Sequence, residues 1–140
     1  MPCHTIPFDP EKGPYIDVVL SKPLSGYRDE EVNASMYNVK MLIDTGASKT
    51  AISPEVLQKI GLVPIERVPL KSVTSDIKAY IYLADLTCDL FVPCFYMPNI
   101  SILSFEREGG WHIDGFIGRD FLEKVTFEMN GPAKTFTITF

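Results

Sequence analysis

The sequence has few of the residues that disulfide-rich or zinc-binding proteins are built from. It holds 140 residues, with 3 Cys, 2 His and 1 Trp. An odd cysteine count argues against a disulfide framework, and two distant histidines do not form the cluster that a zinc site needs. The longest apolar stretch, at residues 90–97, is interrupted by Pro93 and is too short to span a bilayer.

Positive charge is also scarce. The net charge is −5, the isoelectric point is near 5.0, and no cluster of Lys or Arg occurs. Nucleic acid is therefore not expected as a partner, because duplex binding depends on a basic surface. The first residues have neither the basic nor the apolar region of a secretion signal. We expect a cytoplasmic chain, or one cut from a larger parent, without a membrane partner.

What the sequence does contain is short apolar segments separated by 11 Pro and 9 Gly. A chain of this length can bury one core, so a single domain over residues 1–140 is expected, with residues 1–13 as a flexible N-terminal extension. The segments have the length and β-branched content of strands. Strands are expected at residues 14–20, 36–43, 73–86, 90–96 and 113–117.

The C-terminal segment predicts a hairpin, because apolar and polar residues alternate on both sides of a turn at residues 130–132. Two short helices are also expected. One begins after Ser53, a good N-cap, and ends at Gly61, which can adopt the left-handed conformation. The other covers residues 120–124. The predicted class is mostly β, in one domain with two short helices.

The most informative stretch is residues 41–48, which read Met-Leu-Ile-Asp-Thr-Gly-Ala-Ser. An apolar strand delivers Asp44 into a tight turn, and Gly46 allows a substrate main chain to approach closely. A carboxylate at the boundary between a buried strand and a loop is suited to proton transfer. Asp, Thr and Gly are also ordinary turn residues, so the tripeptide alone leaves a purely structural turn open.

This stretch resembles the active-site loop of retropepsin-like aspartic peptidases, the family of retroviral proteases and their bacterial and cellular relatives. A second hallmark of that family is an apolar pair, then Gly, then a short helix, and residues 116–122 match it with Phe-Ile-Gly-Arg-Asp-Phe-Leu. The 74 residues from Asp44 to Gly118 leave room for a flap hairpin. The resemblance implies a retropepsin-like acid protease β-barrel.

The resemblance also implies an aspartic endopeptidase acting on a peptide or protein substrate, with no metal or organic cofactor. Two carboxylates that share one proton activate water in this family. The chain has one Asp-Thr-Gly, so a homodimer would supply the second carboxylate. The implied roles are catalysis by Asp44, substrate binding by Gly46 and Ala47, and support of the active site by Thr45, Ser48, Gly118 and Arg119.

Two departures from the family pattern are visible. The expected flap, about residues 70–82, contains no glycine. Ser48 and Lys49 replace the acidic residues that often follow in viral members, so Arg119 is left with Asp120 as a partner or with none. A non-catalytic dimerisation or peptide-binding module is therefore the alternative function. The last strand, residues 134–140, suits either pairing with a second chain or a hairpin within its own.

Overall fold

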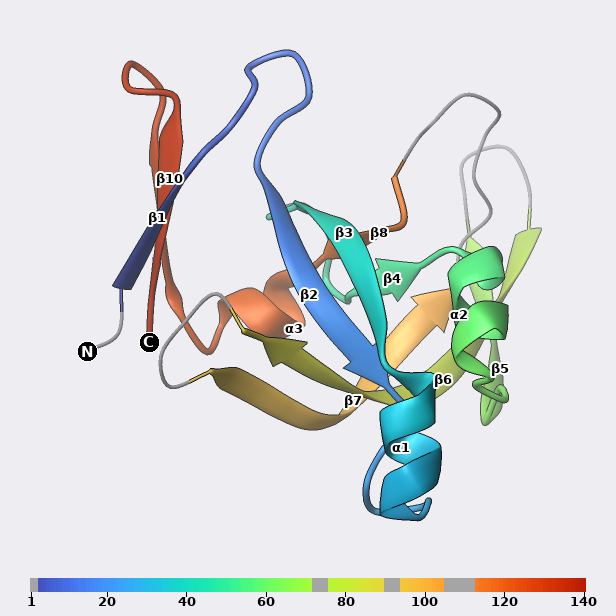
Figure 1. Cartoon of the computed structure of the whole chain (residues 1–140). Helices are drawn as coiled ribbons and strands as arrows, with labels where there is room; N and C mark the ends of the chain where they lie inside the picture. The colour runs from blue at the N-terminus through green and yellow to red at the C-terminus, as the bar shows by residue number, and fades with distance from the viewer. Residues whose placement is uncertain (1–2, 72–75, 90–93, 105–112) are drawn as a thin grey trace.

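The computed structural model describes residues 3–71, 76–89, 94–104 and 113–140 (Figure 1). Most of this part of the chain is β-strand, which confirms the predicted class, but three helices are present instead of two. The strands are β1 Cys3–Pro7, β2 Tyr15–Ser21, β3 Tyr37–Ile43, β4 Ala51–Ile52, β5 Glu66–Lys71, β6 Asp76–Cys88, β7 Phe95–Ser104, β8 Gly115–Ile117, β9 Thr126–Asn130 and β10 Thr135–Thr139. The helices are α1 Asp29–Ser35, α2 Pro54–Ile60 and α3 Arg119–Leu122.

Six strands close into a barrel. Their order is β2-β3-β8-β4-β7-β6, and β2 also pairs with β6, which joins the two ends of the sheet. Closure leaves the apolar faces of the strands pointing inward, where side chains such as Met41, Ile102 and Ile117 are fully buried. β5 continues the sheet beyond β6 as a hairpin at one margin of the barrel. Residues 72–75, where the flap would turn, lie outside the described residues.

A second, three-stranded sheet in the order β1-β10-β9 stands beside the barrel (Figure 1). The β9–β10 hairpin confirms the predicted C-terminal hairpin. The N-terminal segment differs from expectation, because residues 3–7 form β1 and pair with β10 over five residues. Ile6 packs against the core from this strand. Residues 3–7 are therefore part of the fold and not an extension of it.

Several strand limits also differ from those expected. The strands expected at 14–20, 36–43 and 113–117 correspond to β2, β3 and β8, and the segment expected at 73–86 overlaps β6. Of the strand expected at 90–96, residues 90–93 lie outside the described residues, and β7 begins at Phe95 and runs on to Ser104, beyond the expected end. Pro98 and Asn99, which has a positive φ of 51°, lie in the middle of this strand, where the two residues stand opposite Asp85 alone of β6. The strand continues through these two residues as a bulge in β7.

The helix that the sequence did not predict is α1. Its first turn carries Asp29, Glu30 and Glu31, which favour the positive end of the helix dipole. Val32 is its only buried apolar side chain, so the sequence lacks the helical period of apolar residues. The predicted helix after Ser53 is confirmed as α2, and Gly61 ends it with a φ of 83°.

Asp85 of β6 forms hydrogen bonds with two other segments of the chain. The sequence-based predictions did not identify this contact. Its carboxylate is 2% exposed and accepts hydrogen bonds from the Leu24 and Asn99 amides at 3.0 and 2.9 Å. The Tyr96 hydroxyl donates a third, at 2.6 Å. Three donors compensate the burial of this charged group, so the loop before α1 is fixed to β7.

The hydrogen bond to Asp85, followed by burial and by the nearby negative charge, raises the pKa of Tyr96 to about 12. The folded chain thus holds this phenol proton more tightly than the unfolded chain, whose pKa is near 10.0. The stabilising contribution is present below the unfolded pKa and is lost as pH rises toward 12.

We expect the ultraviolet titration of the 6 tyrosines to include a step near pH 12 that Tyr96→Phe removes. The same variant should lose less stability than the wild type as pH rises from 10 to 12. An unchanged high-pH step in the variant would contradict the role of the Asp85 contact.

All three cysteines are free, and Cys88 alone among them is buried. None of the helices in the described part of the chain is long and apolar enough to cross a membrane.

Candidate active site

β3 carries Asp44 to the surface of the barrel. Met41 and Ile43 point into the core, whereas Leu42 lies on the opposite, partly exposed face. Side chains alternate along a strand, so half-buried Asp44 follows on the same outward face as Leu42. The Asp44 amide donates to the Ile117 carbonyl of β8 at 2.9 Å, which fixes the point where the loop leaves the sheet.

The loop that follows, residues 44–48, turns tightly around the Asp44 carboxylate. The Gly46 amide donates to Asp44 Oδ1 at 2.9 Å, and the Ala47 amide donates to the Asp44 carbonyl at 3.2 Å. A Cβ atom at Gly46 would lie 3.1 Å from Asp44 Oδ1. A larger residue would therefore crowd the carboxylate, and glycine lets the amide reach it. We call residues 44–48 the Asp44 loop.

Arg119 holds this loop from the second motif. Its amide donates to the Ala47 carbonyl at 2.8 Å, and its guanidinium Nη1 donates to the Thr45 carbonyl at 2.9 Å. The expectation that Arg119 pairs with Asp120 or lacks a partner is therefore wrong. Main-chain carbonyls take the place of an acidic side chain, so the arginine still joins the two motifs although Ser48 and Lys49 are not acidic.

Asp120 instead binds Thr50, a contact that the sequence did not reveal. Thr50 is 1% exposed, and its amide and hydroxyl both donate to the Asp120 carboxylate, at 3.0 and 2.8 Å. The Thr50 hydroxyl oxygen also accepts a hydrogen bond from the Gly118 amide at 3.2 Å. These bonds anchor the end of the Asp44 loop to the start of α3. The two residues are 70 positions apart, so only the folded chain brings them together.

Gly118 is where the two motifs approach most closely. A Cβ atom at this position would lie 2.5 Å from the carbonyl carbon of Lys49 and 2.7 Å from its oxygen. The conformation itself would suit other residues, since φ is −95°. Space, and not backbone freedom, therefore requires glycine here.

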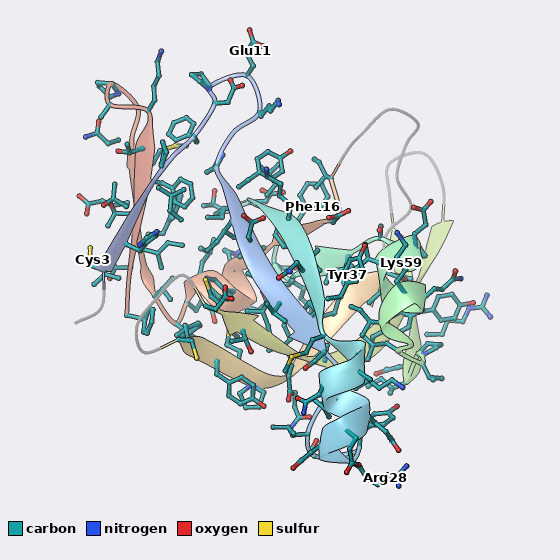
Figure 2. The ribbon with its side chains drawn as sticks, in the orientation of Figure 1. Cys3, Glu11, Arg28, Tyr37, Lys59 and Phe116 are labelled. Atoms are coloured by element: carbon teal, nitrogen blue, oxygen red, sulfur yellow. The ribbon has the colours of Figure 1, made fainter. Side chains whose placement is uncertain are left out.

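Apolar side chains flank Asp44 on the outward face of the sheet. Leu42 pairs in register with Tyr15 of β2 on one side and Phe116 of β8 on the other, and all three are partly exposed. Figure 2 shows Phe116 close to β3. Sequence reasoning used Phe116 as part of a motif but did not identify it as a wall of the site. Strand pairing between β3 and β8 was the missing information.

A hollow of about 760 Å³ opens beside this apolar row. Leu42, Tyr15 and Ile113 contribute apolar surface, and the loop between β1 and β2 contributes most of the rest. A volume of this order accommodates a side chain or a small ligand. The residues that line it are Pro7, Phe8, Asp9, Glu11, Lys12, Gly13, Tyr15, Lys40, Leu42 and Ile113.

One chain supplies one carboxylate to this site. Within residues 3–71, 76–89, 94–104 and 113–140, no second acidic side chain is hydrogen-bonded to the Asp44 carboxylate, whose partner is the Gly46 amide. In the same part of the chain, no three His, Cys, Asp or Glu side chains gather as a metal site would require.

The sequence pattern of the aspartyl protease family matches residues 31–121, which include the Asp44 loop and the start of α3. The chain belongs to the aspartyl protease family. The match covers the two motifs that the hydrogen bonds of Arg119 and Thr50 join, so the family assignment and the geometry concern the same residues.

Solved structures place this family member among the retropepsin-like folds. A retropepsin-like aspartic protease from Rickettsia conorii is similar with a TM-score of 0.63 at 16% identity, covering 99% of this chain and 90% of that one. EIAV protease in complex with the inhibitor HBY-793 is similar with a TM-score of 0.52 at 11% identity, covering 85% and 93%. None of the curated proteins compared with the chain gives a match. The resemblance inferred from residues 41–48 and 116–122 is thereby confirmed at the level of family and fold.

Proposed function

We propose that the chain is an aspartic endopeptidase that acts as a homodimer, with Asp44 of each protomer forming one half of the catalytic pair. The observation that carries this proposal is the Asp44 carboxylate, which is oriented by the Gly46 amide in a loop that the second family motif fastens in place. Only one such loop exists in the sequence. A twofold axis beside the loop would bring two of them together.

The chemistry follows from two carboxylates at close range. Like charges a few ångströms apart cannot both ionise, so the pair retains one shared proton. The ionised member takes a proton from water, and the protonated member donates its proton to the carbonyl oxygen of the peptide bond. Attack of water then gives a tetrahedral intermediate, and proton transfer to the amide nitrogen releases the two products.

A peptide substrate would lie extended across the Asp44 loop. Gly46 and Ala47 carry little or no side chain, so a substrate backbone could approach the loop closely there. The apolar row of Leu42 and Phe116, with the hollow beside it, would take side chains of the substrate. Exposed Thr45 and Ser48 lie on the same loop, and we assign them to its contacts with the partner loop and its support.

An assay of cleavage tests this function. An unfolded protein is incubated with the chain at about pH 5, where a carboxylate pair of this kind can keep its shared proton, with and without an inhibitor that mimics the tetrahedral intermediate. We expect cleavage at internal peptide bonds and its suppression by the inhibitor. Sedimentation velocity at the assay concentration should show a dimer.

Two results would contradict the proposal. Binding of the unfolded protein without any cleavage would favour the non-catalytic peptide-binding module. Cleavage that the inhibitor does not affect, by a chain that stays monomeric, would show that a different group or a contaminating protease performs the reaction.

A further inference from the structure

A second hollow, of about 660 Å³, lies on the surface of the barrel between β7 and α3. Residues 95–101 of β7 line it one after another. Successive side chains of a strand point to opposite faces, so consecutive residues line one hollow where the strand presents its edge. β4 pairs with β7 only at Leu103 and Ser104, and among the described residues no other strand lies on that side of β7. We call this feature the β7–α3 hollow.

The floor of the β7–α3 hollow is apolar and fixed in place. Phe95 packs edge-on against Phe121 of α3, with 5.4 Å between the ring centroids, and against Phe140 at 4.6 Å. Tyr96 is 43% exposed, although its hydroxyl donates a hydrogen bond to buried Asp85. An exposed ring that is already held by such a bond loses little conformational freedom when a ligand packs on it. The floor is therefore prepared to receive an apolar side chain.

Charged side chains border the β7–α3 hollow. Lys124 follows α3, Lys49 follows the Asp44 loop, and both are exposed. Where the structure describes the chain, neither ammonium group forms an ion pair. Asp120 also lines the hollow, but its carboxylate already accepts hydrogen bonds from Thr50. An acidic group of a ligand can therefore pair with the two lysines, and exposed Glu123 is the neighbouring charge that opposes it.

We propose that the β7–α3 hollow binds a flanking segment of a protein substrate, outside the residues at the scissile bond, and favours an acidic side chain next to an apolar one. The lysines select the acidic side chain, and the apolar floor takes its neighbour. Pro98 and the bulge at Asn99 interrupt the edge of β7, which protects it against pairing with a long strand. Side chains, and not a continuous ladder of main-chain hydrogen bonds, would therefore hold the segment.

The position of Lys49 connects this hollow with the catalytic carboxylate. Lys49 is the fifth residue after Asp44, so the chain between their Cα atoms spans at most about 18 Å. An extended substrate advances about 3.3 Å per residue and covers that length in about six residues. A protein that lies across the Asp44 loop can thus reach the hollow a short way from its scissile bond. The twofold axis of the proposed dimer repeats the hollow, so either end of the substrate can meet one copy.

This inference rests on the proposed function, because the occupant is the substrate of the same active site. It adds a surface, separate from the apolar row of Leu42 and Phe116, that would help to determine which proteins are cut.

Peptides with charged flanks test the inference. A short peptide around a bond that the chain cuts in the unfolded protein is prepared alone, with Ala-Asp-Leu-Asp-Ala at both ends, and with Ala-Lys-Leu-Lys-Ala at both ends. Asp side chains are mostly ionised at the assay pH of about 5. We expect the acidic flanks to give a KM about fivefold below that of the basic flanks at an unchanged kcat, since the contact lies away from the reacting atoms. The net charge of −5 would by itself favour the basic flanks, so the opposite preference requires a local contact.

Charge variants locate that contact. Lys124→Glu should abolish the preference for acidic flanks, and Glu123→Gln should strengthen it, because the opposing charge is removed. Lys59→Glu is the matched control. Lys59 is exposed on α2 (Figure 2), and the same change of net charge there should leave the ratio of KM values as in the wild type.

The outcomes separate this inference from the function on which it rests. Equal KM values for the three peptides overturn the role of the hollow and leave the proposed function intact, and so does a Lys124→Glu chain that keeps the wild-type preference. A weaker dimer of Lys124→Glu in sedimentation equilibrium would make the hollow a contact between copies and would also overturn the inference. A wild-type chain that cleaves none of the peptides overturns the proposed function and this inference with it.

Discussion

Asp44→Asn is expected to reduce peptide cleavage by roughly 1,000-fold while leaving the fold unchanged, since the amide cannot accept a proton from water. The Asn oxygen can still accept the hydrogen bond that the Gly46 amide donates to Asp44 Oδ1. Circular dichroism and thermal unfolding should therefore match the wild type. Cleavage is measured as the initial rate on an unfolded protein substrate, at a protein concentration at which dimer formation is complete.

Asp17→Asn is the matched control. Asp17 is exposed on β2 and lies outside the Asp44 loop. The same change of charge there should leave the rate unchanged. Equal cleavage by the wild type and Asp44→Asn would remove Asp44 from the mechanism.

Mixing the two proteins tests whether the pair spans two chains. After subunit exchange at equal concentrations, random assortment leaves about one quarter of the dimers with two wild-type chains. If both carboxylates are needed, activity falls to about one quarter of that of the wild type at the same total concentration, and not to one half. A value of one half would mean that each chain works alone.

Gly118→Ala should destabilise the fold strongly. The added Cβ would lie 2.5 to 2.9 Å from main-chain atoms of Lys49. Lys49 directly follows the Asp44 loop, and the Gly118 amide is hydrogen-bonded to Thr50, so neither backbone segment can shift without disturbing the loop. Overpacking in a tight core lowers the free energy of unfolding by as much as about 3 kcal/mol. For a chain of this size, such a loss lowers the melting temperature by roughly 10 °C, which thermal unfolding would detect.

Gly131→Ala is the control for this prediction. Gly131 lies in the turn between β9 and β10, and a Cβ there would meet nothing within 4 Å. Its melting temperature should stay near that of the wild type. If Gly118→Ala is equally stable, the close approach of the two motifs is not a requirement of the fold.

Local patterns carried most of the information that could be obtained without the structure. Alternation predicted the β9–β10 hairpin, a cap and a glycine predicted α2, and the apolar run before Asp44 predicted β3. Each of these signals lies within a few neighbouring residues, because side-chain alternation and helix capping act over one strand or one turn. The same short range made it possible to identify the family from two motifs.

The strand β1 and the full length of β7 were missed because each depends on a partner strand that is distant in sequence. β1 has five residues and is held by β10, at the other end of the chain. The long strand β7 contains Pro98 and continues because an extra residue is accommodated there as a bulge opposite β6. Neither partner can be read from the residues of the strand itself, since β-sheet stability depends on the neighbouring strand.

The site was predicted in the same uneven way. Residues 44–48 and Gly118 were identified as one site, and the structure places Gly118 against Lys49, the residue that follows this loop. Arg119 was given the wrong partner and Thr50 was not considered, because their hydrogen bonds cross 74 and 68 positions of sequence. Residue type alone could not distinguish a carbonyl partner from a carboxylate one.

By itself, the sequence determined the family, the mostly-β class and the presence of a single Asp-Thr-Gly among 140 residues, whose carboxylate belongs to Asp44. The tertiary structure decided how that carboxylate is held, through Arg119 and Thr50, and which edge of β7 is left open beside α3. The division has a physical cause. A motif is read from bonded neighbours, whereas the partners of a loop and the free edges of a sheet exist only after strands distant in sequence have paired.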